Sequence, residues 1–169
     1  MDIPDPQRGP LARTVTEVRV QEAPFDAAAE YADFSRRKDG RGAVVMFTGC
    51  VRDYSEDAHV SAMTLEHYPG MTEKAMAAIV EEACRRWPLK AVRVIHRHGR
   101  LEPGEDIVLV LVASDHRADA FAACQFLMDW LKTRAPFWKL EETPEGPRWV
   151  EAKAADDAAA ARWEREEAS

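Results

Sequence analysis

The chain has 169 residues, of which 46% are hydrophobic and 31% charged, and its formal net charge is −7. This length and composition predict one globular domain with an apolar core, and the acidic balance argues against a general nucleic-acid-binding protein, because contacts to phosphate groups need a basic face. No apolar run approaches the ~18 residues that suggest a membrane-spanning helix. Residues 1–10 lack the basic-then-apolar order of a secretory signal, so we expect a cytoplasmic protein that does not enter a membrane.

The N-terminal half of the chain predicts a strand, a helix and two further strands. Residues 1–13 are rich in Pro and Asp and predict a disordered lead-in to a single domain over residues 14–165. Asp26 is suited to cap the helix and Gly40 to end it. The run at residues 42–51 is almost continuously apolar, which is typical of a strand buried on both faces. The predicted elements are a strand at 14–21, a helix at 26–38, and strands at 42–51 and 59–68.

The C-terminal half alternates helices with pairs of strands. Pro88 and Pro136 end two of the helices, and Ser114 or Asp115 is the expected cap of the helix between them. The predicted elements are helices at 72–87, 115–134 and 152–167, and strands at 90–98, 107–113, 137–142 and 148–151. Because strand pairs separate the helices, this order predicts an α+β fold with a mixed or antiparallel sheet.

Basic residues flank the sharp exit from the helix that ends before Pro136. Lys132 lies in the predicted last helical turn, and Lys139 lies on the strand that follows. Two lysines on either side of such an exit can point into one concavity, where each could carry charge to an anion or lose it on burial. Alternatively, Lys132 and Arg134 merely complement the C-terminal end of the helix dipole.

Two other segments place basic groups at the ends of elements. His116 and Arg117 stand at a predicted helix start, where cations oppose the dipole and backbone N–H groups bind anions; alternatively, Asp115 compensates them and all three are solvated. Arg52 follows a strand that contains Gly49, which either allows a ligand to approach or marks only a bend. The residues thus indicate a site for a small anionic ligand, but no reaction.

Other common sites are not indicated. The three cysteines, Cys50, Cys84 and Cys124, are far apart, which argues against disulfides and a zinc site and predicts reduced thiols, buried at 84 and 124. His96 and His98 have no partner at metal-ligand spacing, and the pairs at 81–82 and 141–142 are interpreted as solvated glutamates. No phosphate-binding glycine loop, serine nucleophile motif or dinucleotide fingerprint occurs.

Several motifs, taken together, resemble one known family, the catalytic subunit of molybdopterin synthase. Their order and spacing match over about residues 14–165, and the string Lys-Thr-Arg-Ala-Pro-Phe-Trp-Lys is the most specific. The matching segments are residues 64–74, 114–117, 132–139, 143–146 and 148–150.

The resemblance implies an α/β hammerhead fold with a small additional β subdomain. It also implies a homodimer that becomes a heterotetramer by binding a small ubiquitin-like sulfur carrier at each end. The carrier's C-terminal thiocarboxylate would enter the active site, where cyclic pyranopterin monophosphate receives two sulfur atoms and becomes molybdopterin. No cofactor or metal is implied.

The resemblance also implies roles for individual residues. Lys132 matches the main catalytic lysine and Lys139 the second, and we expect Lys132 beside the carrier's terminal carbonyl. Arg52, His116 and Arg117 match residues that hold the anionic end of the substrate. The residues flanking these contacts are Cys50, Val51, Leu140 and Glu141. Leu140 and Cys50 stand where other members often have a basic residue, which lowers the charge of the expected pocket.

Two other classes of function remain open at this point. The same fold could act on another cyclic phosphate as a hydrolase, which would need no sulfur donor. It could also be a non-catalytic module that only binds a ubiquitin-like protein, although the two lysines, 132 and 139, argue for catalysis.

Overall fold

A computed structural model of the chain describes residues 13–55 and 58–167, so the predicted lead-in falls, apart from Arg13, outside the described residues. The elements in chain order are β1 (Val15–Gln21), α1 (Ala27–Ser35), β2 (Ala43–Cys50), β3 (Tyr54–Ser55), β4 (Ala58–His59), β5 (Ala62–His67), α2 (Met71–Arg86), β6 (Leu89–Arg97), β7 (Gly99–Leu101), β8 (Asp106–Ser114), α3 (Arg117–Arg134), β9 (Phe137–Thr143), β10 (Gly146–Trp149) and α4 (Ala154–Glu167). Every predicted element is present, the strand predicted at 59–68 is divided into β4 and β5, and β3 and β7 are additions.

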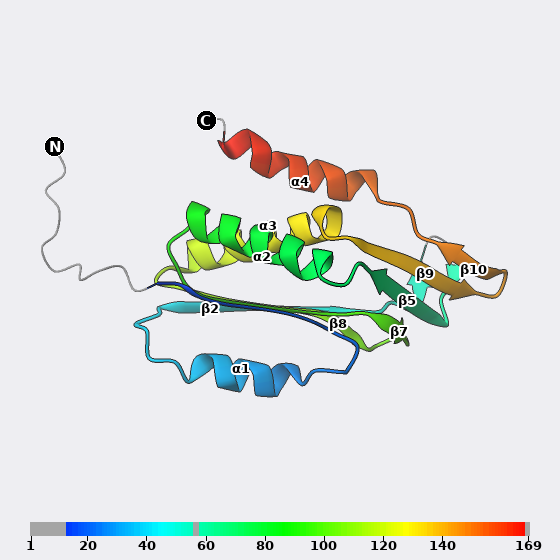
Figure 1. The fold of residues 1–169 in the computed structure, drawn as a ribbon, viewed down its shortest axis with the longest axis horizontal. Helices are drawn as coiled ribbons and strands as arrows, with labels where there is room; N and C mark the ends of the chain where they lie inside the picture. The colour runs from blue at the N-terminus through cyan, green and yellow to red at the C-terminus, as the bar shows by residue number, and fades with distance from the viewer. Residues whose placement is uncertain (1–12, 56–57, 168–169) are drawn as a thin grey trace, which may run out of the picture.

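Two sheets organise the structure. The larger has the strand order β1-β6-β8-β2, with β1 parallel to β6 and the other pairs antiparallel, which confirms the predicted mixed sheet. The smaller sheet, β10-β9-β5-β7, is antiparallel throughout and forms the additional β subdomain. Figure 1 shows α1 below the larger sheet, α2 and α3 above it, and α4 on the outer side of α3.

The core lies on both faces of the larger sheet. Alternate residues of β6 point to opposite faces, so Val92 and Val94 pack against α2 and α3 while Ile95 packs against α1. The side chains of these two apolar clusters, one on each face of the sheet, have little or no exposure. Because β8 contributes side chains to both clusters, its sequence is continuously apolar. The predicted mixed α+β architecture follows from these two apolar layers.

The prediction that residues 42–51 form a strand buried on both faces is wrong. Met46 and Phe47 are 48% and 39% exposed, and they point to opposite faces of β2. The reason is that β2 is the last strand of its sheet, so the helices that cover β6 and β8 leave both of its faces partly open.

The start of α3 also differs from the prediction. Its N-cap is His116, with no side-chain cap, rather than Ser114 or Asp115. Ser114 Oγ donates instead to the carbonyl of Pro88 at 3.0 Å, so this side chain stabilises the core rather than the helix end. The predicted cap of α1 is confirmed, since Asp26 accepts from the N–H of Ala29 at 3.1 Å.

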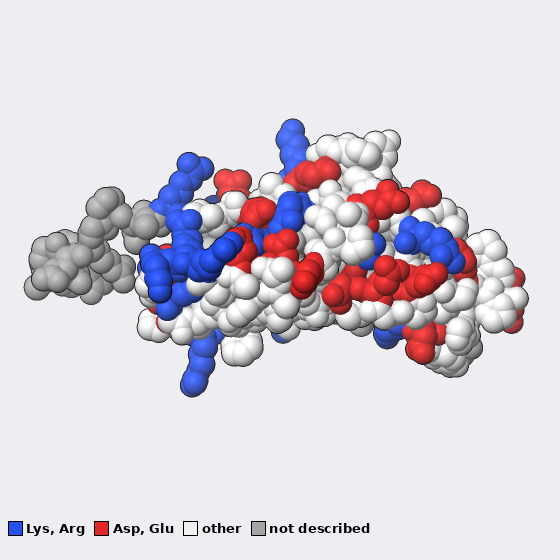
Figure 2. Space-filling model, turned by 90° about the horizontal axis from the view of Figure 1, so that it is seen from below, with Lys and Arg blue, Asp and Glu red and all other residues white. Residues whose placement is uncertain are grey.

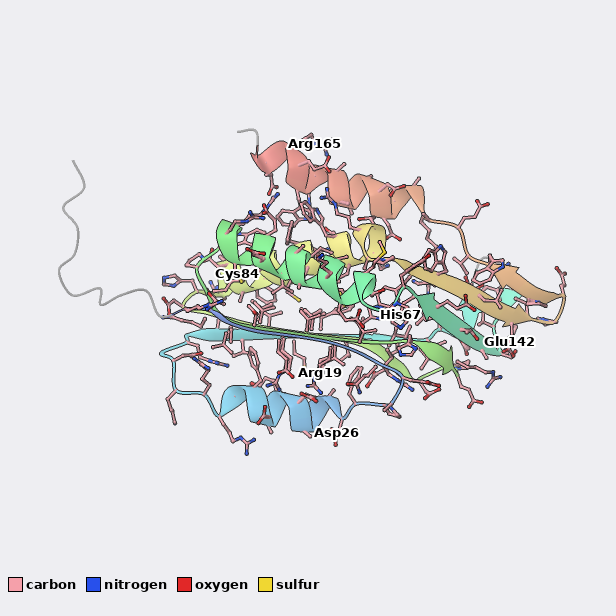
Figure 3. The ribbon with its side chains drawn as sticks, in the orientation of Figure 1. Arg19, Asp26, His67, Cys84, Glu142 and Arg165 are labelled. Carbon is pink, nitrogen blue, oxygen red and sulfur yellow. The ribbon has the colours of Figure 1, made fainter. Side chains whose placement is uncertain are left out.

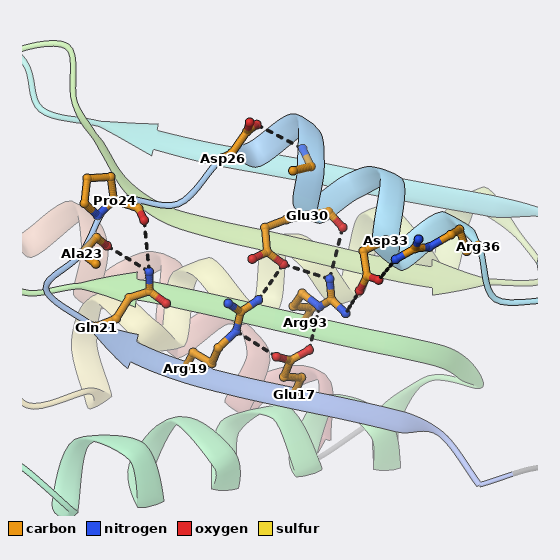
Figure 4. A network of polar contacts seen from close by, with 11 residues as sticks. Glu17, Arg19, Gln21, Ala23, Pro24, Asp26, Glu30, Asp33, Arg36 and Arg93 are labelled. Carbon is orange, nitrogen blue, oxygen red and sulfur yellow. Dashed lines mark hydrogen bonds and ion pairs between the residues drawn. The ribbon is translucent and has the colours of Figure 1, made fainter.

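An ion-pair network fixes α1 under the sheet. Arg93 of β6 donates to Glu30 and Asp33 of α1 at 2.9 and 2.8 Å and lies 2.8 Å from Glu17 of β1. Arg19 of β1 donates to the same Glu30 carboxylate at 2.6 Å (Figure 4). The network therefore joins two strands to one helix.

The C-terminal helix α4 is attached to α3 by a buried contact. Trp163 donates its indole N–H to Asp129 of α3 at 2.7 Å and packs edge-on against Trp87 and Phe126. Arg86 of α2 donates to the carbonyl of Trp163 at 2.8 Å. Among the described residues, no helix is both long and apolar enough to span a bilayer.

Candidate active site

A cavity of ≈ 350 Å³ lies where the end of α3, strand β9 and the segment leading into α4 meet. Its walls carry charges of both signs. The basic side chains are Arg52, Lys132, Lys139 and Lys153, and the acidic ones are Glu141, Glu151, Asp156 and Asp157. The four basic side chains are positioned to meet a small anionic ligand, and four acidic side chains in the same wall balance their charge.

The exit around Pro136 brings the two lysines into this cavity. Lys132 lies in the last turn of α3, and Ala135 is extended, so the chain turns at once into β9. Phe137, Lys139 and Glu141 alternate along β9 and line the cavity from one face of the strand. The prediction that both lysines point into one concavity is confirmed.

The two lysines have different surroundings. The Lys132 ammonium is half exposed and lies 3.6 Å from the Asp156 carboxylate of α4. Burial, reinforced by the positive charge of Lys132, lowers the pKa of Lys139, and Lys153 and Arg52 act in the same direction. No ion pair joins Lys139 to a carboxylate within the described part of the chain. The Lys139 ammonium therefore gives up its proton more readily than that of an ordinary lysine.

Glu141 is buried rather than solvated, which corrects the interpretation of the pair at 141–142 for its first member. Only 4% of Glu141 is exposed, and its carboxylate accepts from Arg148 Nε and Nη2 at 3.0 and 2.9 Å. Arg148 also donates to the carbonyl of Ser55 at 2.7 Å. The charge of Glu141 is thus already matched inside the chain, whereas Glu142 pairs with Arg100 at the surface.

Of residues 50–52, at the end of β2, only Arg52 lines the cavity. Arg52 is exposed and lines it, whereas Val51 is buried and its N–H donates to the carbonyl of Glu105. Cys50 is exposed, does not line the cavity and donates from Sγ to Asp106 at 3.2 Å. Leu140 is likewise absent from the lining, because it alternates with Lys139 and Glu141 along β9.

None of the thiols has the environment of a nucleophile. The hydrogen bond to Asp106 and partial burial raise the pKa of Cys50, and burial raises the pKa of Cys124 to about 11. All three cysteines are free; Cys124 is buried as predicted, whereas Cys84 is only half-buried. No group of three or more His, Cys, Asp or Glu in residues 13–55 and 58–167 could hold a metal ion.

His116 and Arg117 lie at the opposite end of α3 from the two lysines. Both are exposed, and the 15 or 16 residues between them and Lys132 correspond to about 23 Å along α3 at a rise of 1.5 Å per residue. One chain therefore does not bring all the predicted site residues together.

The end of the molecule that holds His116 and Arg117 is basic. The N–H of Gly42 donates to the carbonyl of Ser114 at 3.0 Å, so the basic segment 36–41 runs beside the start of α3. A Cβ on Gly42 would lie 2.2 Å from the Asp115 carbonyl oxygen, so only glycine permits this approach. Figure 2 shows Lys and Arg gathered at the end of the molecule where α1 ends. A local positive surface thus exists despite the net charge of −7.

Sequence reasoning missed a cluster of rings behind β9. His96 stacks on Phe137 with ring centres 3.8 Å apart, and its Nδ1 lies 2.8 Å from the carbonyl of Arg97, so Nδ1 carries the proton. Burial lowers the pKa of His96 to about 4, so the ring is neutral beside Lys139. His67 lies beside the first turn of α2 in Figure 3, and its ring centre is 4.4 Å from that of His98.

Lys153 and Asp156 were also missed. They flank the start of an Ala-rich helix, where an isolated lysine or aspartate carries no pattern that separates it from an ordinary solvated residue. Only the three-dimensional course of the segment after β10 reveals that both line the cavity.

Comparison with known proteins gives a consistent set of matches. The family model described as MoaE protein matches residues 20–134. A molybdopterin synthase catalytic subunit of Pseudomonas aeruginosa is 58% identical over 147 residues, covering 87% of this chain and 98% of that protein. The protein of the same description from Escherichia coli is 59% identical over 148 residues, covering 88% and 98%.

Solved structures match the fold as well. The molybdopterin biosynthesis MoaE protein from Burkholderia ambifaria has a TM-score of 0.75 and 53% identity, with 88% of this chain and 98% of that chain covered. The molybdopterin synthase structure from Staphylococcus aureus has a TM-score of 0.72 and 31% identity, covering 79% and 96%.

Proposed function

We propose that this chain, which belongs to the MoaE protein family, is the catalytic subunit of a molybdopterin synthase. As a sulfurtransferase of molybdenum cofactor biosynthesis, it moves two sulfur atoms from the thiocarboxylated C-terminus of a small ubiquitin-like carrier to cyclic pyranopterin monophosphate. The observation that carries this proposal is the convergence of Lys132 and Lys139 in one cavity. The relatives' shared description as a catalytic subunit supports it.

The lysines suit the demands of the reaction. Attack on an acyl group develops negative charge on its carbonyl oxygen, which the exposed Lys132 ammonium is placed to stabilise. The pterin side chain must exchange protons as each sulfur is added, and Lys139, whose pKa is lowered, suits that task. Because the carrier supplies the sulfur, no cysteine of this chain has to act as a nucleophile.

Arg52 is assigned to the anionic end of the substrate. Its guanidinium presents a planar pair of donors suited to phosphate, and it lines the same cavity as the lysines. Glu141 contributes to the wall from a buried position, whereas Cys50, Val51 and Leu140 lie near the cavity without lining it.

We assign His116 and Arg117 to the cavity of a second copy of the chain. Within one copy they lie about 23 Å from Lys132 along α3, so they can join a substrate site only across a homodimer. Their basic end complements a cavity that must hold a phosphorylated substrate. Each cavity of the homodimer would receive one carrier tail, giving a heterotetramer, and we place the reaction in the cytoplasm.

Reconstitution tests this function against its rivals. The chain is mixed with thiocarboxylated carrier and cyclic pyranopterin monophosphate, and the dithiolene product is assayed. We expect product only when the carrier bears the thiocarboxylate. Consumption of the pterin phosphate without any carrier would indicate a hydrolase instead. Carrier binding with no turnover by folded protein would indicate a non-catalytic binding module.

A further inference from the structure

The carboxylate of Asp156 is the only one in the described residues that forms an ion pair with a lysine of the cavity. Its Oδ1 lies 3.6 Å from Lys132 Nζ. The neighbouring Asp157 lines the same cavity and forms no ion pair with a described residue. Two adjacent carboxylates on one helical turn therefore differ in whether they pair with Lys132, which makes one the natural control for the other.

The position of Asp156 is determined by the fold on both sides. The carbonyl of Lys153 accepts from the N–H groups of Asp156 and Asp157 at 2.9 and 3.2 Å, which defines the first turn of α4. Further along α4, Trp163 is hydrogen-bonded to Asp129, which lies three residues before Lys132 on α3. Both partners of the ion pair are thus tied to the same helix, so the carboxylate is held near the ammonium rather than meeting it by chance.

The charges that face Lys139 come from several elements and are mostly positive. Lys132 projects from α3, Arg52 from the segment after β2 and Lys153 from the segment before α4, and all three disfavour a charged Lys139. The carboxylate of Asp156 favours the charged form and is the one acidic group that acts appreciably on it.

The remaining charged or titratable groups are already compensated or more remote. Glu141 of β9 is matched by Arg148 of β10, and His96 of β6 is neutral. Glu151 and Asp157 stand in the wall without contacting either lysine.

We propose that Asp156 is a positioning residue that divides the work of the two lysines. Its carboxylate keeps Lys132 in place as a permanently charged group of the cavity. Lys139, which has no carboxylate partner among the described residues, is left as the group that exchanges a proton. The division of roles between the two lysines rests on the proposed function, whereas the ion pair between Asp156 and Lys132 does not. The ion pair itself is half exposed, so its contribution is to the charge pattern of the site rather than to stability.

Site-resolved lysine labelling tests the pairing without any substrate. The full chain and its variants are treated with an amine-reactive reagent across a range of pH, and the modification of Lys139 is read from peptide masses. In Asp156→Asn we expect the labelling midpoint of Lys139 to fall by roughly 0.5–1 pH unit, because the carboxylate that favours its ammonium form is gone. Asp156→Glu should return the midpoint toward the original value.

Asp157→Asn is the matched control, since it removes the same charge one residue away. We expect its shift to be less than half that of Asp156→Asn. An unmoved midpoint in Asp156→Asn, or equal shifts in both variants, would overturn the pairing. Asp156→Ser provides a second neutral side chain if the asparagine variant does not fold, as judged by circular dichroism.

The pH–rate profile tests the division of roles in the active heterotetramer. Asp156→Asn should lower the plateau of kcat, because Lys132 is no longer held, and should move the acid limb to lower pH by the same amount as the labelling midpoint. A lower plateau with an unmoved limb would reduce Asp156 to a structural residue. If Asp156→Asn shifts the labelling midpoint of Lys139 as expected but the wild-type chain makes no molybdopterin, the proposed function fails while the pairing stands.

Discussion

Cations lie on several sides of Lys139, and they affect the stability of the fold as well as the chemistry of the cavity. Its pKa lies below the ordinary lysine value because of burial and the nearby Lys132, so in the pH window between the two values the unfolded chain binds more protons than the folded chain. Stability must therefore rise as pH rises through that window. Below the window the folded chain carries the full cost of a charged, partly buried lysine.

Replacing Lys139 by methionine should therefore stabilise the fold while abolishing activity. We expect a gain of about 1 kcal/mol in the free energy of unfolding at pH 7, because a charge surrounded by cations is removed and its apolar stem is kept. Urea unfolding measures the change. Lys153→Met, at an exposed position of the same wall, should change stability by less than about 0.5 kcal/mol. A loss of stability in Lys139→Met would contradict the assigned environment.

At the residue scale, the sequence predicted the basic groups better than their partners. The spacing of Lys132 and Lys139 around Pro136 predicted a shared concavity, because a proline after a helix forces a sharp exit. Their roles came from resemblance, since spacing alone also fits a capped helix end. Asp156 and the burial of Glu141 could not be predicted, because both depend on contacts between segments distant in sequence.

At the scale of elements, α4 links the cavity to the core of the protein. Trp163 fills space between α2, α3 and α4, and its indole N–H satisfies the buried Asp129 carboxylate. Gln125 and Arg162 also donate to Asp129, at 2.9 and 3.2 Å. The first turn of α4, with Asp156, depends on this anchor for its place over the cavity.

The variant Trp163→Phe keeps most of the ring packing and removes the donor. We expect it to lower the free energy of unfolding by roughly 1–2 kcal/mol, because a buried carboxylate loses one of its partners. The midpoint of chemical denaturation measures this. Trp149→Phe, at an exposed tryptophan of β10, is the control and should cost less than about 0.5 kcal/mol. Equal effects of the two variants would count against the buried anchor.

Element prediction succeeded where the apolar period was long and failed at edges and ends. The strands β6 and β8 and helices α1 to α4 follow apolar runs or periodic patterns that tertiary contacts reinforce. The burial of β2 was predicted wrongly because a continuous apolar run indicates a strand but not its place in the sheet. β3 and β7 contain two and three residues, too few to show an alternation. The predicted cap of α3 was wrong because the Ser114 side chain is hydrogen-bonded to the carbonyl of Pro88.

At the scale of the whole molecule, the predicted site residues divide between two ends of α3. The lysines and Arg52 share one cavity, whereas His116 and Arg117 belong to a basic surface at the far end. No sequence pattern could reveal this separation, because it depends on the length and direction of α3 in the folded chain. The homodimer that we propose would resolve it by combining the two ends from different copies.

Mixed dimers test this arrangement. Arg117→Ala and Lys132→Ala should each be inactive or nearly so as homodimers. A mixed dimer has one cavity that carries both changes and one that carries neither, so co-expression should restore activity to roughly a quarter of wild type when half the dimers are mixed. The molybdopterin formed per chain measures this. Failure to restore any activity in dimers shown to be mixed would contradict the assignment of Arg117 to the cavity of the second copy.

The direct test of two lysines acting in one cavity is a single-turnover measurement on Lys132→Ala. The variant is saturated with thiocarboxylated carrier and cyclic pyranopterin monophosphate, and the rate of dithiolene formation is compared with that of the wild-type chain, with carrier affinity measured alongside. We expect the rate to fall by about 100-fold or more while the carrier still binds, because the charge that stabilises the reacting carbonyl is gone. A rate within a few-fold of wild type would show that sulfur transfer takes place elsewhere.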